Sequence, residues 1–300
     1  MKPTSIHTAA RRPRLGLALG SGSARGWSHV GVIRALEAAG VRPDVICGSS
    51  VGALIGAVYA AGELDRFEQW IRGLRWRSVL ALLDMKIDGG LIEGSRLVEF
   101  FRRHFADPGI EGLALPFGCV ATDLATGAEV WLRDGAVIES VRASAALPGL
   151  LTPVERDGTL LVDGGLVNPV PVSLCRAMGA EMVVAVDLNW SLMRRRLRRE
   201  PAPAQQAPSG LVDELMQRVR GRRPRTGRQL PSLLDVLLGS LNIMQVRITN
   251  SRLAGEPADV VVRPDLSDFG LLDFHRAAVA IAEGERAMSR ALPALQELLG

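Results

Sequence analysis

Short apolar runs alternate with longer segments of helical periodicity along most of the chain. The apolar runs have the length of strands and lie beside turn residues, so they predict strands at 15–19, 45–47, 116–122, 129–132, 160–162, 182–186 and 259–262. Helical spacing predicts helices from a glycine-rich turn to Gly40, and at 51–62, 64–77, 97–105, 137–146, 170–178, 233–244 and 273–299. Strands alternating with helices predict an α/β fold with a mainly parallel sheet covered on both faces.

Residues 1–13 and 191–230 depart from this pattern. The first segment predicts a disordered leader, and the second, with its Arg runs and a Pro-Ala-Pro-Ala stretch, predicts a flexible insertion. We expect residues 14–300 to form one domain, because a hydrophobic content of 47% in 300 residues supplies a sizeable core. Residues 45–62 carry no charge, but a Gly-Ser-Ser turn interrupts them, which favours a buried strand and helix over a membrane span.

Cysteine usage and the N-terminus predict a cytoplasmic protein. Cys47, Cys119 and Cys175 are far apart in the sequence and form no C-x-x-C pattern, which argues against a disulfide framework and a zinc site. The first fourteen residues lack the apolar segment of a secretory signal. Because nothing resembles a calcium loop either, we expect no metal and no cofactor.

The first predicted strand runs into a glycine-rich turn, Gly20–Gly26. The dinucleotide fingerprint requires G-x-G-x-x-G, whereas the glycines here are spaced G-x-G-x-x-x-G, and Asp44 precedes the second strand instead of ending it. The turn fits an oxyanion hole better, because amides that precede a helix have no intrahelical acceptor and can donate to developing negative charge. The predicted oxyanion-hole residues are Gly20, Gly22, Ser23, Ala24 and Arg25.

The second predicted strand is followed by Gly48-Ser49-Ser50-Val51-Gly52, which fits G-x-S-x-G. In a nucleophile elbow this spacing holds a serine on a sharp strand-to-helix turn, and glycines at 48 and 52 allow neighbouring backbone to pass closely. Ser50 is therefore a candidate nucleophile. The motif is short and common, so a turn without chemistry is the alternative on this stretch alone.

Two residues could serve as the base for Ser50. Asp163 ends a predicted strand and precedes Gly164 and Gly165, which leave room for close contact with another group. Desolvation could raise its pKa enough for proton transfer, although Asp-Gly-Gly is also an ordinary turn sequence. A Ser50-Asp163-His275 triad would follow the order of α/β-hydrolases, but those enzymes have several strands before the elbow.

Taken together, these motifs resemble the patatin-like phospholipases, and within them the bacterial proteins related to neuropathy target esterase. The resemblance rests on the stretches 20–26, 48–52 and 163–169 in the expected order, and on 90–92, 121–123 and 143–148. It extends from about 14 to 189, with a weaker tail from 233. Ser21 departs from the family pattern, which usually has glycine there.

The resemblance implies a three-layer α/β/α patatin-like fold and a Ser50–Asp163 dyad without a catalytic histidine. It implies hydrolysis of acyl esters of phospholipids or lysophospholipids through an acyl-enzyme, without a metal. We expect the apolar segment 78–92 to form a wall of the acyl pocket. Two alternatives stay open, namely a regulatory or binding protein of the same fold without turnover, and acyl transfer to an alcohol.

The charge distribution bears on partners. The chain has a net charge of +4, yet residues 191–230 contain 11 Arg and 3 acidic residues, so the remainder is mildly acidic. Electrostatic docking of this segment to an anionic membrane and a solvated loop without a partner are both open interpretations. The segment lacks the interleaved aromatic residues of single-strand binders, which argues against nucleic acid. The sequence makes no prediction of the oligomeric state.

Overall fold

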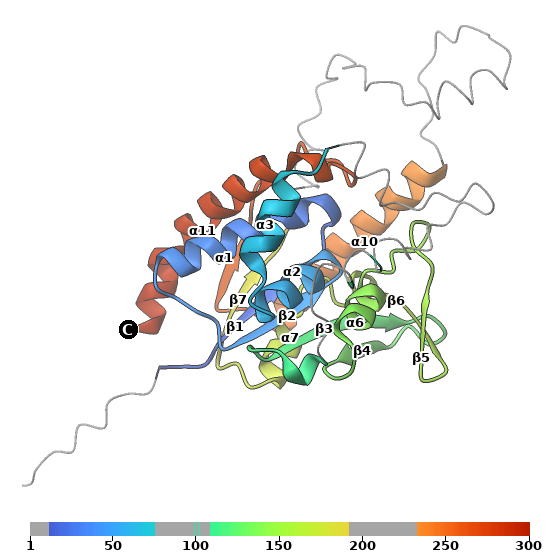
Figure 1. The fold of residues 1–300 in the computed structure, drawn as a ribbon, viewed down its shortest axis with the longest axis horizontal. Helices are drawn as coiled ribbons and strands as arrows, with labels where there is room; N and C mark the ends of the chain where they lie inside the picture. The colour runs from blue at the N-terminus through green and yellow to red at the C-terminus, as the bar shows by residue number, and fades with distance from the viewer. Residues whose placement is uncertain (1–11, 76–98, 100–101, 103–108, 192–232) are drawn as a thin grey trace, which may run out of the picture.

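The computed structural model describes residues 12–75, 99, 102, 109–191 and 233–300 (Figure 1). Nearly all of the predicted leader, the predicted pocket wall at 78–92 and the predicted insertion at 191–230 lie outside these residues. The predicted helix 97–105 is described only at Glu99 and Arg102, and both are helical.

The described strands form one eight-stranded mixed sheet, in the order β5-β6-β3-β2-β1-β7-β8, with β4 paired to β3. Five neighbouring strands are parallel: β1 (Leu15–Leu19), β2 (Val45–Ser49), β3 (Phe117–Asp123), β7 (Met182–Val186) and β8 (Val260–Val262). The antiparallel strands are β4 (Glu129–Leu132), β5 (Val154–Arg156) and β6 (Thr159–Asp163). The predicted mainly parallel sheet is confirmed in its central part, and the unpredicted β5 adds to an antiparallel end.

Helices cover both faces of this sheet, so the predicted three-layer α/β/α arrangement is confirmed (Figure 1). Alternate residues of β1 enter separate clusters, with Leu17 and Leu19 on one face and Ala18 on the other. The described helices are α1 (Ser28–Ala38), α2 (Val51–Ala60), α3 (Leu64–Arg72), α6 (Val137–Ser144), α7 (Val172–Ala177), α10 (Leu233–Gly255) and α11 (Ala277–Leu299). Short 3-10 turns lie at Ser23–Trp27, Ile110–Gly112, Gly164–Leu166 and Phe274–Arg276.

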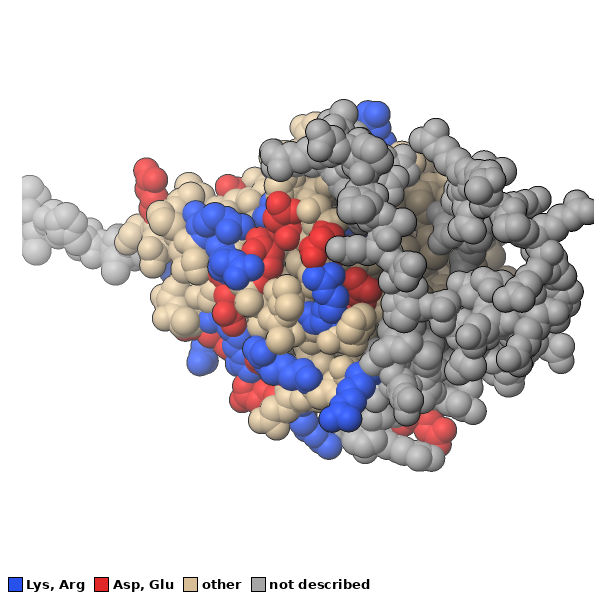
Figure 2. Space-filling model, turned by 90° about the horizontal axis from the view of Figure 1, so that it is seen from above, with Lys and Arg blue, Asp and Glu red and all other residues tan. Residues whose placement is uncertain are grey.

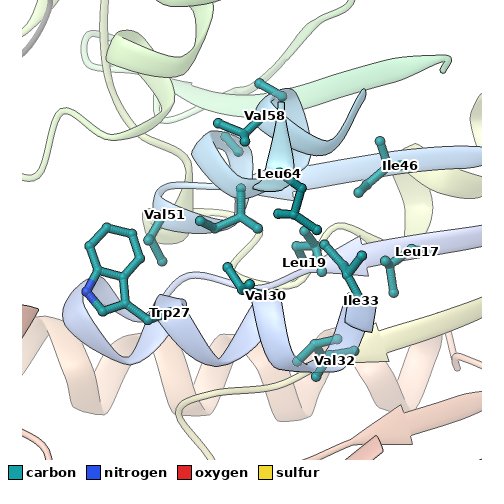
Figure 3. Packing of buried hydrophobic residues seen from close by; sticks show 14 of the residues in the cluster. Leu17, Leu19, Trp27, Val30, Val32, Ile33, Ile46, Val51, Val58 and Leu64 are labelled. Carbon is teal, nitrogen blue, oxygen red and sulfur yellow. The ribbon is translucent and has the colours of Figure 1, made fainter. Parts of the chain in front are cut away.

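The larger cluster holds α1 and α2 against β1 and β2. Figure 3 shows Val30 and Ile33 of α1 pointing toward the same apolar space as Leu19 of β1 and Val51 of α2. All four are buried. The uncharged stretch 45–62 is thus a strand and a ten-residue helix, as expected. Within the residues that the structure describes, no helix has the length and hydropathy that crossing a membrane requires.

The edge of β3 brings two strand ends together. Residues 117–120 of β3 pair with β2, and residues 121–123 pair with β6 on the same edge, because β4 occupies the other edge at 119–122. The two strands run in opposite directions along that edge, since β2 is parallel to β3 and β6 is antiparallel to it. Ser49 pairs with Val120 and Asp163 with Ala121, so β2 and β6 end facing each other.

Two glycines allow α1 and α11 to touch through their backbones. A Cβ on Gly31 of α1 would overlap the carbonyl oxygen of Ile281, and a Cβ on Gly284 of α11 would overlap the carbonyl oxygen of Ser28. The contact therefore joins a helix from the first tenth or so of the chain to the last helix. It buries Ile281 and Met288 of α11 completely.

We predict that Gly31→Ala lowers the free energy of unfolding by roughly 3 kcal/mol, because the added methyl group has to push two helix backbones apart. Gly255→Ala is the matched control, since a Cβ there would meet no atom within 4 Å. Urea unfolding of both variants beside the parent protein measures the difference. Equal midpoints for the two variants would contradict the tight backbone contact.

Candidate active site

The G-x-S-x-G stretch forms the expected turn between β2 and α2. Ser50 has φ 58° and ψ −123°, a conformation that is strained for a residue with a side chain. A Cβ on Gly48 would overlap the backbone of Ala53, and one on Gly52 would overlap the carbonyl oxygen of Leu19. The two glycines of the motif are therefore required by close packing of the turn.

A hydrogen bond from α6 supports this strained turn. The Ser50 amide donates to the Ser144 hydroxyl oxygen at 2.9 Å, and Ser144 is fully buried. Because Ser50 precedes the first helical turn of α2, its N–H has no intrahelical acceptor, and Ser144 supplies one. Ser144 lies in the 143–148 stretch of the family resemblance, but nothing in the sequence showed which group it contacts.

Asp163 occupies the end of β6 and is fully buried. The Ser50 hydroxyl donates to Asp163 Oδ2 at 2.6 Å, and the Gly165 amide donates to Asp163 Oδ1 at 2.7 Å. The Thr122 hydroxyl donates to the Asp163 carbonyl oxygen at 2.8 Å and fixes the backbone to β3. Gly164 lies too close to the Val120 carbonyl oxygen to carry a Cβ. The two predicted side chains are therefore in direct contact.

The environment of Asp163 makes its carboxylate more basic. Burial raises the pKa from 3.8 to about 6, although the hydrogen bonds from Ser50 and Gly165 lower it in part. A carboxylate with a pKa near 6 is ionised at neutral pH and is a stronger base than a solvated aspartate. Such a group can accept the proton of the hydroxyl that it already contacts.

Neither described histidine lies between the two side chains. His29 is buried on α1, and its Nε2 is 2.8 Å from the Gly20 carbonyl oxygen. Burial lowers its pKa to about 4, so the ring is neutral and donates to that carbonyl. His275 is exposed and does not line the pocket that contains Ser50. The direct 2.6 Å contact leaves no room for an imidazole in between.

The glycine-rich turn faces the same pocket. The Gly20 amide donates to the Val186 carbonyl oxygen at 3.1 Å, the Ala24 amide to Leu271 at 3.2 Å, and the Arg25 amide to Gly22 at 3.2 Å. Among the described residues, the amides of Gly22 and Ser23 have no hydrogen-bond acceptor. Of the five residues predicted for the oxyanion hole, these two have amides free to donate to a ligand.

The side chain of Arg25 brings a buried positive charge to this turn. Its Nε donates to the Gly22 carbonyl oxygen at 3.0 Å, and its Nη2 donates to Asn242 Oδ1 of α10 at 3.4 Å. Burial lowers the pKa of Arg25 to about 10, against the opposing effect of Asp187. The guanidinium therefore stays charged at neutral pH and attracts negative charge in the pocket.

Ser50, Asp163, Gly22, Ser23 and Arg25 line one pocket of about 230 Å³. Most of the remaining wall is apolar. Several helices contribute apolar side chains, among them Val51, Leu54, Ala57 and Val58 of α2, Trp70 of α3, Val137, Ile138 and Val141 of α6, and Leu238 and Leu241 of α10. The contribution of α10 was not predicted, because no motif marks it. Within the described residues, no group of three or more His, Cys, Asp or Glu side chains could hold a metal ion.

Comparison with known proteins gives one family. The family profile described as "Patatin-like phospholipase" matches residues 17–176. An uncharacterised NTE family protein of Mycobacterium tuberculosis is 34% identical over 341 aligned positions, which cover 95% of this chain and 92% of the relative. Patatin-like phospholipase domain-containing protein 6 of Homo sapiens is 40% identical over 184 positions, but these cover 58% of this chain and 13% of the human protein.

Among solved structures, VipD from Legionella pneumophila aligns over 82% of this chain and 67% of its own length. The TM-score is 0.38 and the sequence identity is 14%.

We predict that Asp163→Asn stabilises the fold at neutral and alkaline pH. The pKa of Asp163 is higher in the folded protein than in the unfolded chain. Ionised Asp163 therefore destabilises the native state, by about 3 kcal/mol above pH 6. The neutral amide removes this penalty and keeps similar hydrogen-bond geometry. The gain should be full at pH 8 and should disappear as the pH falls from 6 to 4, where the native carboxyl group becomes protonated.

Chemical unfolding at pH 8 and pH 4 measures this difference. Asp157→Asn is the control, because its side chain is 93% exposed and the change should alter stability by less than about 0.5 kcal/mol. A stability gain of Asp163→Asn that is the same at both pH values would contradict the buried, ionised carboxylate.

Proposed function

Because the chain belongs to the patatin-like phospholipase family, as its sequence motifs suggested, we propose that it hydrolyses acyl esters of phospholipids or lysophospholipids with a Ser50–Asp163 dyad. The observation that carries this proposal is the 2.6 Å hydrogen bond from the Ser50 hydroxyl to the Asp163 carboxylate. The bond lies at the wall of a mostly apolar pocket. The family relation supports lipid hydrolysis, and the dyad and the type of ester are our proposal.

In the first half of the reaction, Ser50 Oγ attacks the ester carbonyl carbon while its proton moves to Asp163 Oδ2. The tetrahedral intermediate then expels the alcohol, which takes the proton from Asp163, and an acyl-Ser50 ester remains. In the second half, Asp163 accepts a proton from water, and the resulting hydroxide attacks the acyl carbon. Ser50 recovers its proton as the fatty acid leaves.

The free amides of Gly22 and Ser23 are the proposed oxyanion donors. They face the same pocket as Ser50, and the other amides of the turn at 20, 24 and 25 already have acceptors. Removing a single oxyanion donor typically slows catalysis by about 100- to 1000-fold. The charged Arg25 side chain adds positive potential near the developing oxyanion. Ser21 differs from the glycine of the family pattern, but this difference does not remove the amides of Gly22 and Ser23.

The apolar wall of the pocket supports an acyl chain as the group that binds beside Ser50. Burying a methylene group is worth about 0.8 kcal/mol, so an apolar pocket favours long acyl groups over short ones. A reducing, cytoplasmic location is part of the proposal, and it rests on three cysteines that are all buried and unpaired.

We predict that Ser50→Ala and Asp163→Ala each lower kcat for a short-chain p-nitrophenyl ester by at least about 1000-fold, because each removes half of the dyad. Ser49→Ala is the matched control. Its hydroxyl is buried next to Ser50 but has no hydrogen-bond partner among the described residues, so kcat should stay within a few-fold of the parent value.

A fluorophosphonate probe followed by peptide mass spectrometry should find the label on Ser50 and none on Ser49. Circular dichroism shows whether the alanine variants remain folded. Turnover that persists in either dyad variant would contradict the mechanism, and label on Ser49 would place the nucleophile one residue away.

The activity should also depend on pH through Asp163. The base works only when ionised, so kcat/KM should be constant above about pH 7 and fall roughly tenfold per pH unit below the pKa of about 6. The exposed His275 offers a control, because His275→Ala should leave both the rate and the profile unchanged. A profile that changes in His275→Ala would assign the base to the imidazole and not to Asp163.

A further inference from the structure

Helix α10 carries an exposed apolar face. Val236, Leu237, Ile243 and Met244 are 47%, 49%, 38% and 48% exposed. The pairs 236/243 and 237/244 are each seven residues apart, which is two helical turns, so the four side chains share one side of the helix. We call them the outer face of α10. They are four of the nine large hydrophobic residues that are exposed in the described part of the chain.

The opposite side of α10 forms part of the candidate active site. Leu238, Leu241, Asn242 and Gln245 line the pocket that contains Ser50 and Asp163. Asn242 and Gln245 accept hydrogen bonds from Arg25 and Ser21 of the glycine-rich turn. One helix therefore has the acyl pocket on one side and the outer face on the other.

The charge on and around α10 is positive. The sequence has no acidic residue from 236 to 255, and the exposed Arg247 is four residues after Ile243, on the same side. The chain that immediately precedes the helix carries 11 Arg and 3 acidic residues at 191–230. By contrast, the face seen in Figure 2 mixes both signs of charge. Elsewhere in the described chain opposite charges form ion pairs, such as that of Arg34 with Glu68 at 2.9 Å. Apolar residues beside arginines are the combination found in helices that lie in the interface of anionic bilayers.

We propose that the outer face of α10 docks onto an anionic lipid bilayer, with the apolar side chains in the interface and Arg247 among the head groups. This rests on the proposed function, since a lipid ester must leave a bilayer or micelle before it reaches Ser50. Docking through α10 places that surface against the helix that lines the pocket.

The experiment compares vesicle binding of full-length variants, all in a Ser50→Ala background so that the lipid is not hydrolysed. Leu237→Glu/Met244→Glu places two acidic groups on the outer face. Val279→Glu/Leu298→Glu is the matched control, because these α11 residues are 50% and 49% exposed and lie outside the pocket. Sedimentation with vesicles of phosphatidylcholine and phosphatidylglycerol at equal ratio gives the partition coefficients.

We expect the α10 double variant to bind at least tenfold more weakly than the parent, and the α11 double variant to bind within twofold of it. Equal binding by the two double variants, or no vesicle binding by the parent, would overturn the proposal. So would a parent dimer, seen by light scattering, that the α10 variant disrupts while its vesicle binding stays unchanged, because a second copy would then cover the outer face.

Versions that retain Ser50 separate this inference from the proposed function. Hydrolysis of a soluble short-chain ester should be unchanged in both double variants, which shows that the fold and the dyad are intact. If the parent does not hydrolyse any ester, the proposed function fails, whereas the vesicle comparison in the Ser50→Ala background still tests the docking surface.

Discussion

The hydrogen bond between Ser50 and Asp163 depends on the way in which two strands share one edge of β3. Strand β2 arrives from one end and β6 from the other, so their last residues meet without being hydrogen-bonded neighbours in a ladder. In a purely parallel sheet, the two strands would end on the same side of the sheet, but their ends would be separated by at least the spacing of adjacent strands, about 4.7 Å. The antiparallel β6 allows a serine and an aspartate from distant parts of the chain to point at each other.

The site combines two unfavourable features that the surrounding structure has to compensate. Ser50 adopts a positive φ, and Asp163 is an ionisable group with no exposed surface. Strain of this kind typically costs about 1–3 kcal/mol. The Ser144 hydroxyl, the Gly165 amide and the tight backbone contacts around residues 48, 52 and 164 hold both residues in place. The desolvation that destabilises ionised Asp163 also raises its pKa, as its proposed role as a base requires.

Much of the fold could be predicted because local patterns agree with the final structure. The apolar run 182–186 is β7 residue for residue, and the elbow at 48–52 joins a strand to a helix as its glycines require. Strand β5 was missed because Val-Glu-Arg is short and two of its three residues are charged, although the Asp157-Gly158 turn that follows has the positive φ values of a tight hairpin. The Asp-Gly dipeptide could therefore have predicted the β5–β6 hairpin.

The site was predictable in its motifs but not in its surroundings. Glycine spacing identifies the turns that carry Ser50 and Asp163, because a position where backbones pack closely requires a residue without a Cβ. Which amides of the glycine-rich turn stay free could not be predicted, because two of the other amides donate to carbonyl groups distant in the sequence, those of Val186 and Leu271. The helix α10 was expected at 233–244 and extends to 255, yet hydropathy alone does not distinguish the side that lines a pocket from the side that faces solvent.

The contact of α1 with α11 has a consequence for biosynthesis. Strand β1 lies between β2 and β7, and α1 packs against α11, with Gly31 and Gly284 at the closest approach of the two backbones. The side of α1 that contacts α11 therefore stays uncovered until α11 (Ala277–Leu299) has been synthesised. Contacts between segments so distant in the sequence form slowly. We therefore expect chaperones to protect this chain during translation.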